Sequence, residues 1–334
     1  MHLSALIVAV STRCKALGLR TTNQVGHGKP RLAAALWPVV FGSLLLAAFS
    51  LFTGCTMKTQ MLRIEGFGQP LAPGAILDSA SGRILTFDQL MDRLSQARVI
   101  YVGENHTSPA CHAIQLQVIK ALVARGETVS VGMEMFDHTY QAKLDQWSAG
   151  KWDWSTFLKQ THWYANWGYD DALYKDILET IKAKHLKLVG LNIPFCIPPK
   201  IAIGGLDSLS AAERAQLPAK IDLSNKAHRE YVRKVFERHA FRGHKDFDNF
   251  YAAQCAWEDG MAQAIADHLG KGPMVVLVGN GHIVRKFGVP DRAFKRTHAA
   301  FFTVYLASPQ MTVSRQDADF IWVTNPVSTK TAMH

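Results

Sequence analysis

Residues 275–283 read VVLVGNGHI, an apolar run that ends in glycine, asparagine, glycine and histidine. Three more stretches have the same form: VIYVGENH at 99–106, VSVGMEMF at 129–136 and LKLVGLN at 186–192. In each, a short run rich in β-branched residues reaches Val-Gly, and a polar residue follows within three positions. Continuous apolar runs of this length are typical of strands in a parallel sheet that is covered on both faces. These four stretches therefore decide the predicted fold.

Amphipathic helices lie between these strands. Residues 112–126 are expected to form one that ends at Gly126, and residues 169–185 are expected to form another. Strands that alternate with helices predict an α/β fold with a mostly parallel sheet flanked by helices. Two segments, near 137–168 and 200–270, interrupt the alternation and read as helices. We expect these helical insertions to form a smaller subdomain over one end of the sheet.

The first 54 residues have the composition of a targeting segment. They carry five basic residues and no acidic residue, and an uncharged stretch of 24 residues runs from Leu32 to Cys55. A basic region, an apolar region and small residues before a cysteine resemble a bacterial lipoprotein signal, with lipid attached to Cys55. An uncleaved transmembrane anchor is the alternative, because the apolar run is long enough to span a bilayer. The predicted organisation is a signal peptide at 1–54, a lipidated tether at 55–72 and the α/β domain at 73–334.

Charge and the residue after Cys55 bear on where the protein resides. Thr56 follows the cysteine, and in lipoproteins of bacteria with two membranes a residue other than aspartate there favours the outer membrane. The formal net charge is +10, and +5 remains once the five basic residues of the first 54 are removed. This mild excess suits anionic partners such as membrane lipids, and no run of lysine and arginine is dense enough to indicate nucleic acid. The sequence therefore predicts an outer membrane lipoprotein of the cell envelope.

The strand ends carry the first candidate site. Parallel α/β sheets bind ligands at the carboxyl ends of their strands, so the polar residues after the Val-Gly pairs are expected at one edge. Two strand ends share the form GxxH, and together the four ends present Glu104, Asn105, His106, Glu134, Asn192, Asn280 and His282. Histidine with glutamate suits either a divalent metal or general acid–base chemistry. The alternative is that each histidine serves only hydrogen bonding within the fold.

Aromatic and basic segments carry the second candidate site. Five aromatic or histidine side chains lie within eight residues: His162, Trp163, Tyr164, Trp167 and Tyr169. Residues 226–251 place His228, His239, His244 and Tyr251 among lysines and arginines. Haem requires flat apolar walls, an axial ligand such as histidine or tyrosine, and cations for its propionates. The alternative is that the tryptophans pack in the core and the basic helix faces solvent.

Five segments together resemble one known family. VGENHTSPACHAIQ, VGMEMFD, WYANWGYDDALYKDILETIKAKHLKLVGLNIP, FYAAQCAWEDGMAQAIADHL and VLVGNGHIVRKFGVPDR are similar to the ChaN-like haem-binding lipoproteins, over about residues 73–330. The resemblance implies an α/β core with a smaller helical part, tethered to the outer membrane and linked to iron supply. It also implies a homodimer that encloses two haems, each iron held by a tyrosine and the propionates by a histidine and a lysine. The candidates for these roles here are Tyr164, Tyr169 and Tyr251 for iron, and His162 or His244 with Lys245 for propionates.

The wider fold group also contains enzymes. The two GxxH motifs resemble those of the Tiki/TraB metalloproteases, and the group includes erythromycin-esterase-like hydrolases. By that resemblance His106, Glu134 and His282 would hold a metal or activate water, with Glu104 as the acid or base. A haem-binding lipoprotein is the first hypothesis and a membrane-tethered, metal-dependent hydrolase is the alternative. Whether the protein is an enzyme stays open at this point, as does a third reading, a scaffold whose crevice has no activity.

Overall fold

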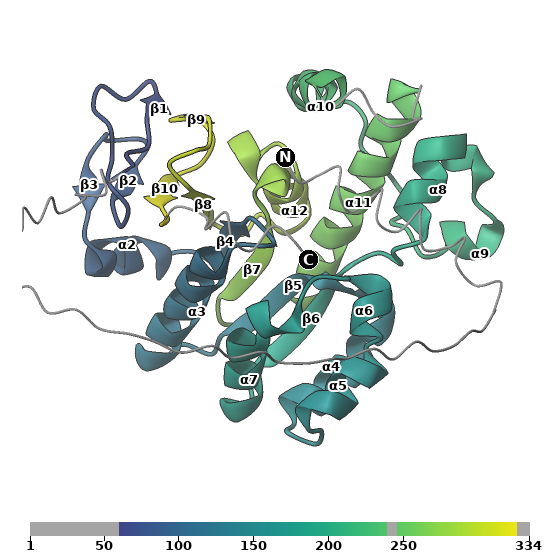
Figure 1. The fold of residues 1–334 in the computed structure, drawn as a ribbon. Helices are drawn as coiled ribbons and strands as arrows, with labels where there is room; N and C mark the ends of the chain where they lie inside the picture. The colour runs from purple at the N-terminus through teal and green to yellow at the C-terminus, as the bar shows by residue number, and fades with distance from the viewer. Residues whose placement is uncertain (1–59, 239–245, 326–334) are drawn as a thin grey trace, which may run out of the picture.

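A computed structural model describes residues 60–238 and 246–325. An eight-stranded sheet runs through it in the order β3-β2-β10-β8-β4-β7-β5-β6 (Figure 1). Its strands are β2 (Ile76–Asp78), β3 (Ile84–Leu85), β4 (Val99–Glu104), β5 (Ser130–Asp137), β6 (Lys187–Asn192), β7 (Met274–Gly279), β8 (Phe301–Ala307) and β10 (Phe320–Val323). The six strands from β10 to β6 are parallel, and β2 and β3 add an antiparallel edge. The predicted α/β class with a mostly parallel sheet is confirmed.

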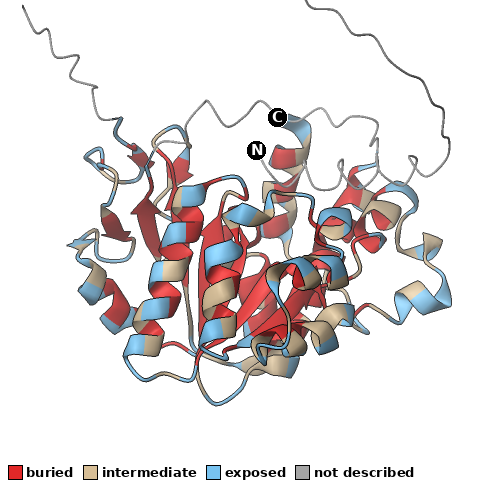
Figure 2. Ribbon diagram, turned by 60° about the horizontal axis from the view of Figure 1, so that its bottom comes forward, coloured by how far each residue is buried: buried red, intermediate tan, exposed pale blue. Residues whose placement is uncertain are grey.

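Burial on both faces explains why the four Val-Gly stretches read as continuous apolar runs. Every residue of β4, β5 and β7 is buried, and these strands lie in the middle of the sheet. The packed helices include α2 (Phe87–Leu94), α3 (Pro109–Ala124), α7 (Lys175–Ala183), α11 (Phe247–His268) and α12 (Val289–Thr297). Figure 2 shows the strands as buried, whereas the outer sides of helices alternate between intermediate and exposed residues. The apolar strands therefore form the core of the domain.

Helix α3 illustrates how local sequence sets the element ends. Ser108 is its N-cap and accepts a hydrogen bond from the Cys111 amide at 3.4 Å, and Pro109 opens the first turn. After the helix, Gly126 has a φ of +83°, a conformation that favours glycine. This agrees with the predicted helix end at Gly126.

Helices also fill the two segments that interrupt the alternation. The first contains α4 (Gln141–Ser148), α5 (Trp154–Gln160) and α6 (Trp163–Asn166), and the second contains α8 (Ile197–Gly204), α9 (Ala211–Arg214), α10 (Lys226–Arg238) and α11. Three tryptophans of the first segment, Trp147, Trp163 and Trp167, are buried in the main core. Most of that aromatic segment is thus core packing.

A small two-stranded module lies on the side of the molecule away from α8 and α9. Strand β1 (Ile64–Glu65) pairs in parallel with β9 (Val313–Ser314), and Figure 1 places this pair beside β2, β3 and β10. Within residues 60–238 and 246–325, no helix has both the length and the apolar character needed to cross a membrane. The predicted signal peptide and Cys55 lie outside the described residues, as do His239, His244 and Lys245.

Candidate functional site

The turn after β7 shows why glycine and asparagine follow the apolar run. A Cβ atom on Gly103 of β4 would lie 2.1 Å from Oδ1 of Asn280, so only glycine lets the two segments approach this closely. Asn280 in turn donates from Nδ2 to the Leu306 carbonyl at 2.8 Å and accepts from the Leu306 amide at 3.3 Å. The asparagine therefore ties β7 to β8 across the end of β4, and His282 is carried inward, where it is buried.

Glu104, at the end of β4, is the centre of the first part of the site. Its Oε1 accepts from the Tyr174 hydroxyl at 2.6 Å and lies 2.7 Å from His106 Nδ1, and its Oε2 accepts from Gln115 Nε2 at 2.8 Å. Burial by itself raises the pKa of a carboxyl group. Here the charge interaction with His112 and the hydrogen bonds from His106 and Tyr174 outweigh burial and lower the pKa of Glu104 to about 2. Glu104 is therefore an ionised carboxylate that orients His106.

Glu134, on β5, is the centre of the second part. It accepts from the Gly279 amide at 2.7 Å and lies 3.4 Å from His282 Nε2. A Cβ atom on Gly279 would lie 3.2 Å from His106 Nε2 and 3.7 Å from Glu134 Oε2, so this glycine separates the two groups at close range. Burial opposes ionisation, but the neighbouring His282 lowers the pKa of Glu134. The ends of β4, β5 and β7 thus bring Glu104, His106, Glu134 and His282 together, as the parallel-sheet argument predicts.

His282 lies between two carboxylates. Its Nε2 faces Glu134 at 3.4 Å and its Nδ1 faces Glu258 at 3.3 Å. Burial alone lowers the pKa of an imidazole, but the two carboxylates outweigh it and raise the pKa of His282 to about 10. At neutral pH His282 is therefore an imidazolium cation that links two glutamates, Glu134 and Glu258.

Glu258 extends this charge network into the interior. Besides His282, it lies within 3.3 Å of His228 Nε2 and 3.4 Å of Arg292 Nε, and all of these side chains are buried. Arg292 also pairs with Asp259, whose other oxygen accepts from Arg296 at 2.8 Å. Neither Glu258 nor Arg292 was among the residues predicted from the sequence. The sequence offers one weak signal, the adjacent acids Glu258 and Asp259 in the middle of α11, because acids are buried only when cations pair with them.

The predicted metal ligands His106, Glu134 and His282 are not arranged as a metal centre. Among the residues that the structure describes, no group of three or more histidines, cysteines, aspartates or glutamates could hold a metal ion. For the predicted set, His282 directs both ring nitrogens at carboxylates, and His106 directs Nδ1 at Glu104. The arrangement is that of buried ion pairs, and it does not favour the metal-dependent hydrolase.

Comparison with known proteins places the chain in a family. The sequence model described as "Haem-binding uptake, Tiki superfamily, ChaN" matches residues 90–293, more than half of the chain. The chain belongs to this ChaN family. No curated protein matches it.

One solved structure shares the fold of this chain, and two others are more distant. One, described as "Cofacial heme binding to ChaN of Campylobacter jejuni", is 18% identical, covers 74% of this chain and 95% of its own, and has a TM-score of 0.58. The type III effector HopBA1 has 13% identity, a TM-score of 0.42, and coverage of 72% and 93%. The erythromycin esterase EreC has 14% identity, a TM-score of 0.41, and coverage of 66% and 72%. At these identities the first comparison supports the fold alone.

The structure places the three tyrosines that were predicted from the sequence as haem ligands in different surroundings. The Tyr164 ring is 53% exposed, and its hydroxyl donates to Asp171 Oδ1. Tyr169 is half-buried, with its ring 5.3 Å from both His106 and Trp167. Tyr251 is fully buried in α11 and donates to the Asn225 carbonyl at 3.2 Å. Tyr251 could therefore meet a haem only if the core opened.

The pKa values of the two accessible phenols have different causes. The hydrogen bond to Asp171, more than burial, raises the pKa of Tyr164 to about 12. Burial, with smaller effects of Glu134 and Glu104, raises the pKa of Tyr169 to about 12. His162 is exposed beside them, with Nδ1 2.9 Å from the Tyr140 hydroxyl. In the ChaN context, His162 remains the described candidate for a propionate partner.

Proposed function

We propose that this protein is a membrane-tethered lipoprotein that binds haem and takes part in haem or iron uptake, as a homodimer in the outer membrane. Membership of the ChaN family supports the haem-binding part. The lipoprotein-like sequence around Cys55 supports the tether. The solved ChaN relative, described as binding haem cofacially, shares the fold and supports the same ligand.

The exposure of Tyr164 carries the proposal. A tyrosine binds ferric iron as the phenolate, so iron must displace a phenol proton that the hydrogen bond to Asp171 holds, with the pKa of Tyr164 raised to about 12. Asp171 accepts that hydrogen bond, and Trp154 Nε1 donates to the other Asp171 oxygen at 2.7 Å and fixes the carboxylate. Tyr164 is the most exposed of the three candidates. We therefore assign Tyr164 as the first candidate iron ligand and Tyr169 as the second.

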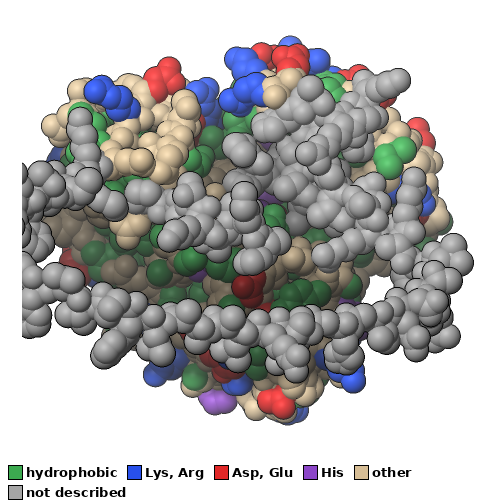
Figure 3. All heavy atoms as spheres, viewed as in Figure 1, with side chains coloured by type: hydrophobic (Ala, Val, Ile, Leu, Met, Phe, Trp, Pro, Cys, Tyr) green, Lys and Arg blue, Asp and Glu red, His purple; other side chains and the backbone are tan. Residues whose placement is uncertain are grey.

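Part of the face that includes α6 is apolar. Between the grey segments, Figure 3 shows hydrophobic side chains with acidic ones among them, and lysines and arginines mainly toward the rim. Bound haem would supply a ferric iron for the phenolate and two propionates. His162 is the described candidate for a propionate contact, and His244 with Lys245 remain predictions from the sequence.

Haem titration of the full chain in nonionic detergent tests the ligand assignment. We expect saturable binding with a tyrosinate-like charge-transfer absorption band. Tyr164→Phe should abolish that band and weaken binding at least about tenfold, which corresponds to roughly 1.4 kcal/mol. Tyr231→Phe on α10 is the matched control, and Tyr251→Phe should also leave the spectrum unchanged. An unaltered band in Tyr164→Phe with its loss in Tyr169→Phe would move the ligand to Tyr169, and no saturable haem binding would refute the proposed function.

Membrane fractionation tests the tether. Cys55→Ser removes the thiol to which lipid would be attached, so the protein should move from the membrane fraction to the soluble fraction or remain as unprocessed precursor of higher mass. Cys196→Ser, at the start of α8, is the control and should stay with the membrane. Membrane retention of Cys55→Ser at an unchanged mass would instead support an uncleaved anchor.

A further inference from the structure

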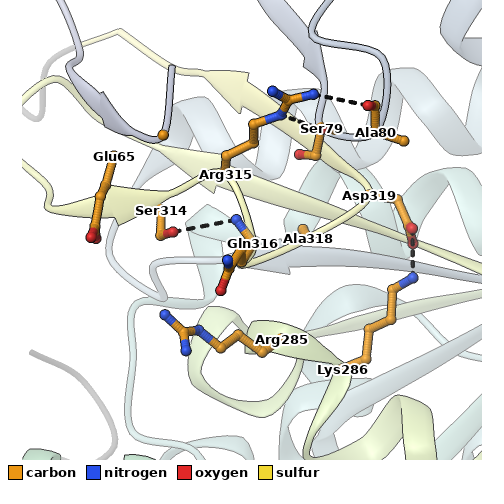
Figure 4. A pocket seen from close by; sticks show the side chains of 11 residues that line it. Glu65, Ser79, Ala80, Arg285, Lys286, Ser314, Arg315, Gln316, Ala318 and Asp319 are labelled. Atoms are coloured by element: carbon orange, nitrogen blue, oxygen red, sulfur yellow. Dashed lines mark hydrogen bonds and ion pairs between the residues drawn. The ribbon is translucent and has the colours of Figure 1, made fainter. Parts of the chain in front are cut away.

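A polar cavity of about 760 Å³ is lined in part by residues of β1 and β9 (Figure 4). Figure 1 shows these two strands on the other side of the molecule from α8. Its volume falls within the range of small-molecule sites, roughly 300–1,000 Å³. Such sites are mostly apolar, whereas this one is lined by Arg285, Lys286 and Arg315, by Glu65 and Asp319, and by Ser314 and Gln316. Its chemistry therefore suits a small ligand that carries charge.

All three cations have partners, and that of Arg285 is the Asp317 carboxylate at 3.4 Å. Lys286 Nζ donates to Asp319 at 2.6 Å, and Arg315 donates to the carbonyl oxygens of Ser79 and Ala80. Figure 4 shows these side chains turned toward their partners and away from the middle of the cavity. The charge of Lys286 is neutralised by Asp319, whereas Arg315 keeps its positive charge in the cavity wall because its partners are neutral carbonyl oxygens.

Arg285 and Glu65 are held less tightly than Lys286 and Arg315. Arg285 has one hydrogen bond from its side chain, a long one of 3.4 Å from Nε to Asp317, and 42% of its side chain is exposed. Among the described residues the Glu65 carboxylate forms no ion pair, and Glu65 is exposed. Figure 4 shows both side chains on the same side of the cavity, with Ser314 and Gln316 between them. The cavity thus offers Arg285, whose contact with Asp317 is a long one through Nε, and the Glu65 carboxylate as charged groups for a ligand.

The cavity also lies close to the proposed membrane anchor. Glu65 belongs to β1, whose partner β9 contributes Ser314, and the Gln310 side chain before β9 donates to Gln60, the first described residue. Only four residues lie between Cys55 and Gln60, and the five Cα–Cα steps of an extended chain span at most about 18 Å. If Cys55 carries lipid, this module is the part of the domain held nearest to the membrane surface.

We infer that this cavity binds the zwitterionic phosphoethanolamine headgroup of a membrane phospholipid. The phosphate would meet the Arg285 guanidinium, with Ser314 and Gln316 as hydrogen-bond donors, and the ammonium would meet the Glu65 carboxylate. A ligand with a phosphate alone would leave Glu65 unpaired beside it. The inference rests on the proposed tether, which brings the headgroups within reach.

Soluble headgroups test the inference without depending on the anchor. Glycerophosphoethanolamine is titrated by calorimetry into the full chain in nonionic detergent, and glycerophosphoglycerol and inorganic phosphate are the comparison probes. We expect saturable binding of glycerophosphoethanolamine that is at least about tenfold tighter than that of the other two. Arg285→Gln and Glu65→Gln should each weaken it by about tenfold or more. Arg125→Gln, which removes a surface ion pair with Asp92 at the end of α3, is the matched control and should bind normally.

Each contrary result has a distinct meaning. Absence of saturable binding, or binding that neither variant weakens, overturns the site. Equal binding of inorganic phosphate overturns the zwitterionic ligand. Because the probes are soluble, a Cys55→Ser protein that leaves the membrane but binds no headgroup refutes the cavity and leaves the tether standing. A Cys55→Ser protein that stays in the membrane at unchanged mass, yet binds the headgroup, refutes the lipid tether and supports the cavity.

Discussion

Glu258→Ala should lower the free energy of unfolding by about 3–5 kcal/mol, the usual result of removing one partner from a buried ionic group. Glu258 is fully buried and lies within 3.4 Å of nitrogen atoms of His282, His228 and Arg292. Alanine would leave these buried positive or polar groups facing a cavity, with Asp259 as the main remaining partner of Arg292. Urea unfolding, followed by tryptophan fluorescence, measures the loss.

Two further variants separate the charge of Glu258 from its packing. Glu258→Gln keeps the volume and one hydrogen-bonding oxygen, so we expect an intermediate loss. Glu230→Ala, on the exposed face of α10, removes a surface carboxylate that pairs only with Lys234, and should change stability by no more than about 0.5 kcal/mol. A loss below about 1 kcal/mol for Glu258→Ala would show that the network contributes little net stability.

The free energy of unfolding should be greatest between about pH 4.5 and 6.5 and should fall at higher and lower pH. The reason is that folding raises the pKa of one buried group, His282, and lowers that of another, Glu104. The pKa of His282 is raised from 6.5 to about 10, so its contribution is complete below pH 6.5 and is lost as the pH rises through 10. The pKa of Glu104 is lowered from 4.5 to about 2, so its contribution is complete above pH 4.5 and is lost as the pH falls through 2. We expect the alkaline loss to be on the order of a few kcal/mol.

His282→Gln isolates the alkaline part of this profile. The variant cannot lose a proton from the imidazolium, so its unfolding free energy should change much less between pH 6.5 and pH 10 than that of the natural chain. His185→Asn replaces an exposed histidine whose Nδ1 contacts the Ser148 carbonyl, and should keep the full alkaline loss. The same alkaline loss in His282→Gln as in the natural chain would assign the pH dependence to another group.

The haem assignment shows where residue type alone is insufficient. In the sequence, Tyr251 and Tyr164 are equivalent, since both lie among aromatic and basic residues. The structure separates them because α11 is packed between α8, α10, α12 and β6 and buries Tyr251, whereas the short helix α6 leaves Tyr164 exposed beside Asp171. The burial of a side chain depends on which elements pack together, and this packing cannot be read from a single sequence.

Local sequence patterns were sufficient to predict the sheet and the edge at which its polar residues meet. This information is local: an apolar run marks a strand buried on both faces, and the Val-Gly ending places Glu104, Glu134 and His282 at the carboxyl end. Only the tertiary structure decided what these residues face. Tyr174, Gln115, Glu258 and Arg292 reach the site from other elements, and helical packing turns them inward. Because a charged residue on a helix normally faces water, only the packing of α11 and α12 shows that Glu258 and Arg292 are a buried ion pair.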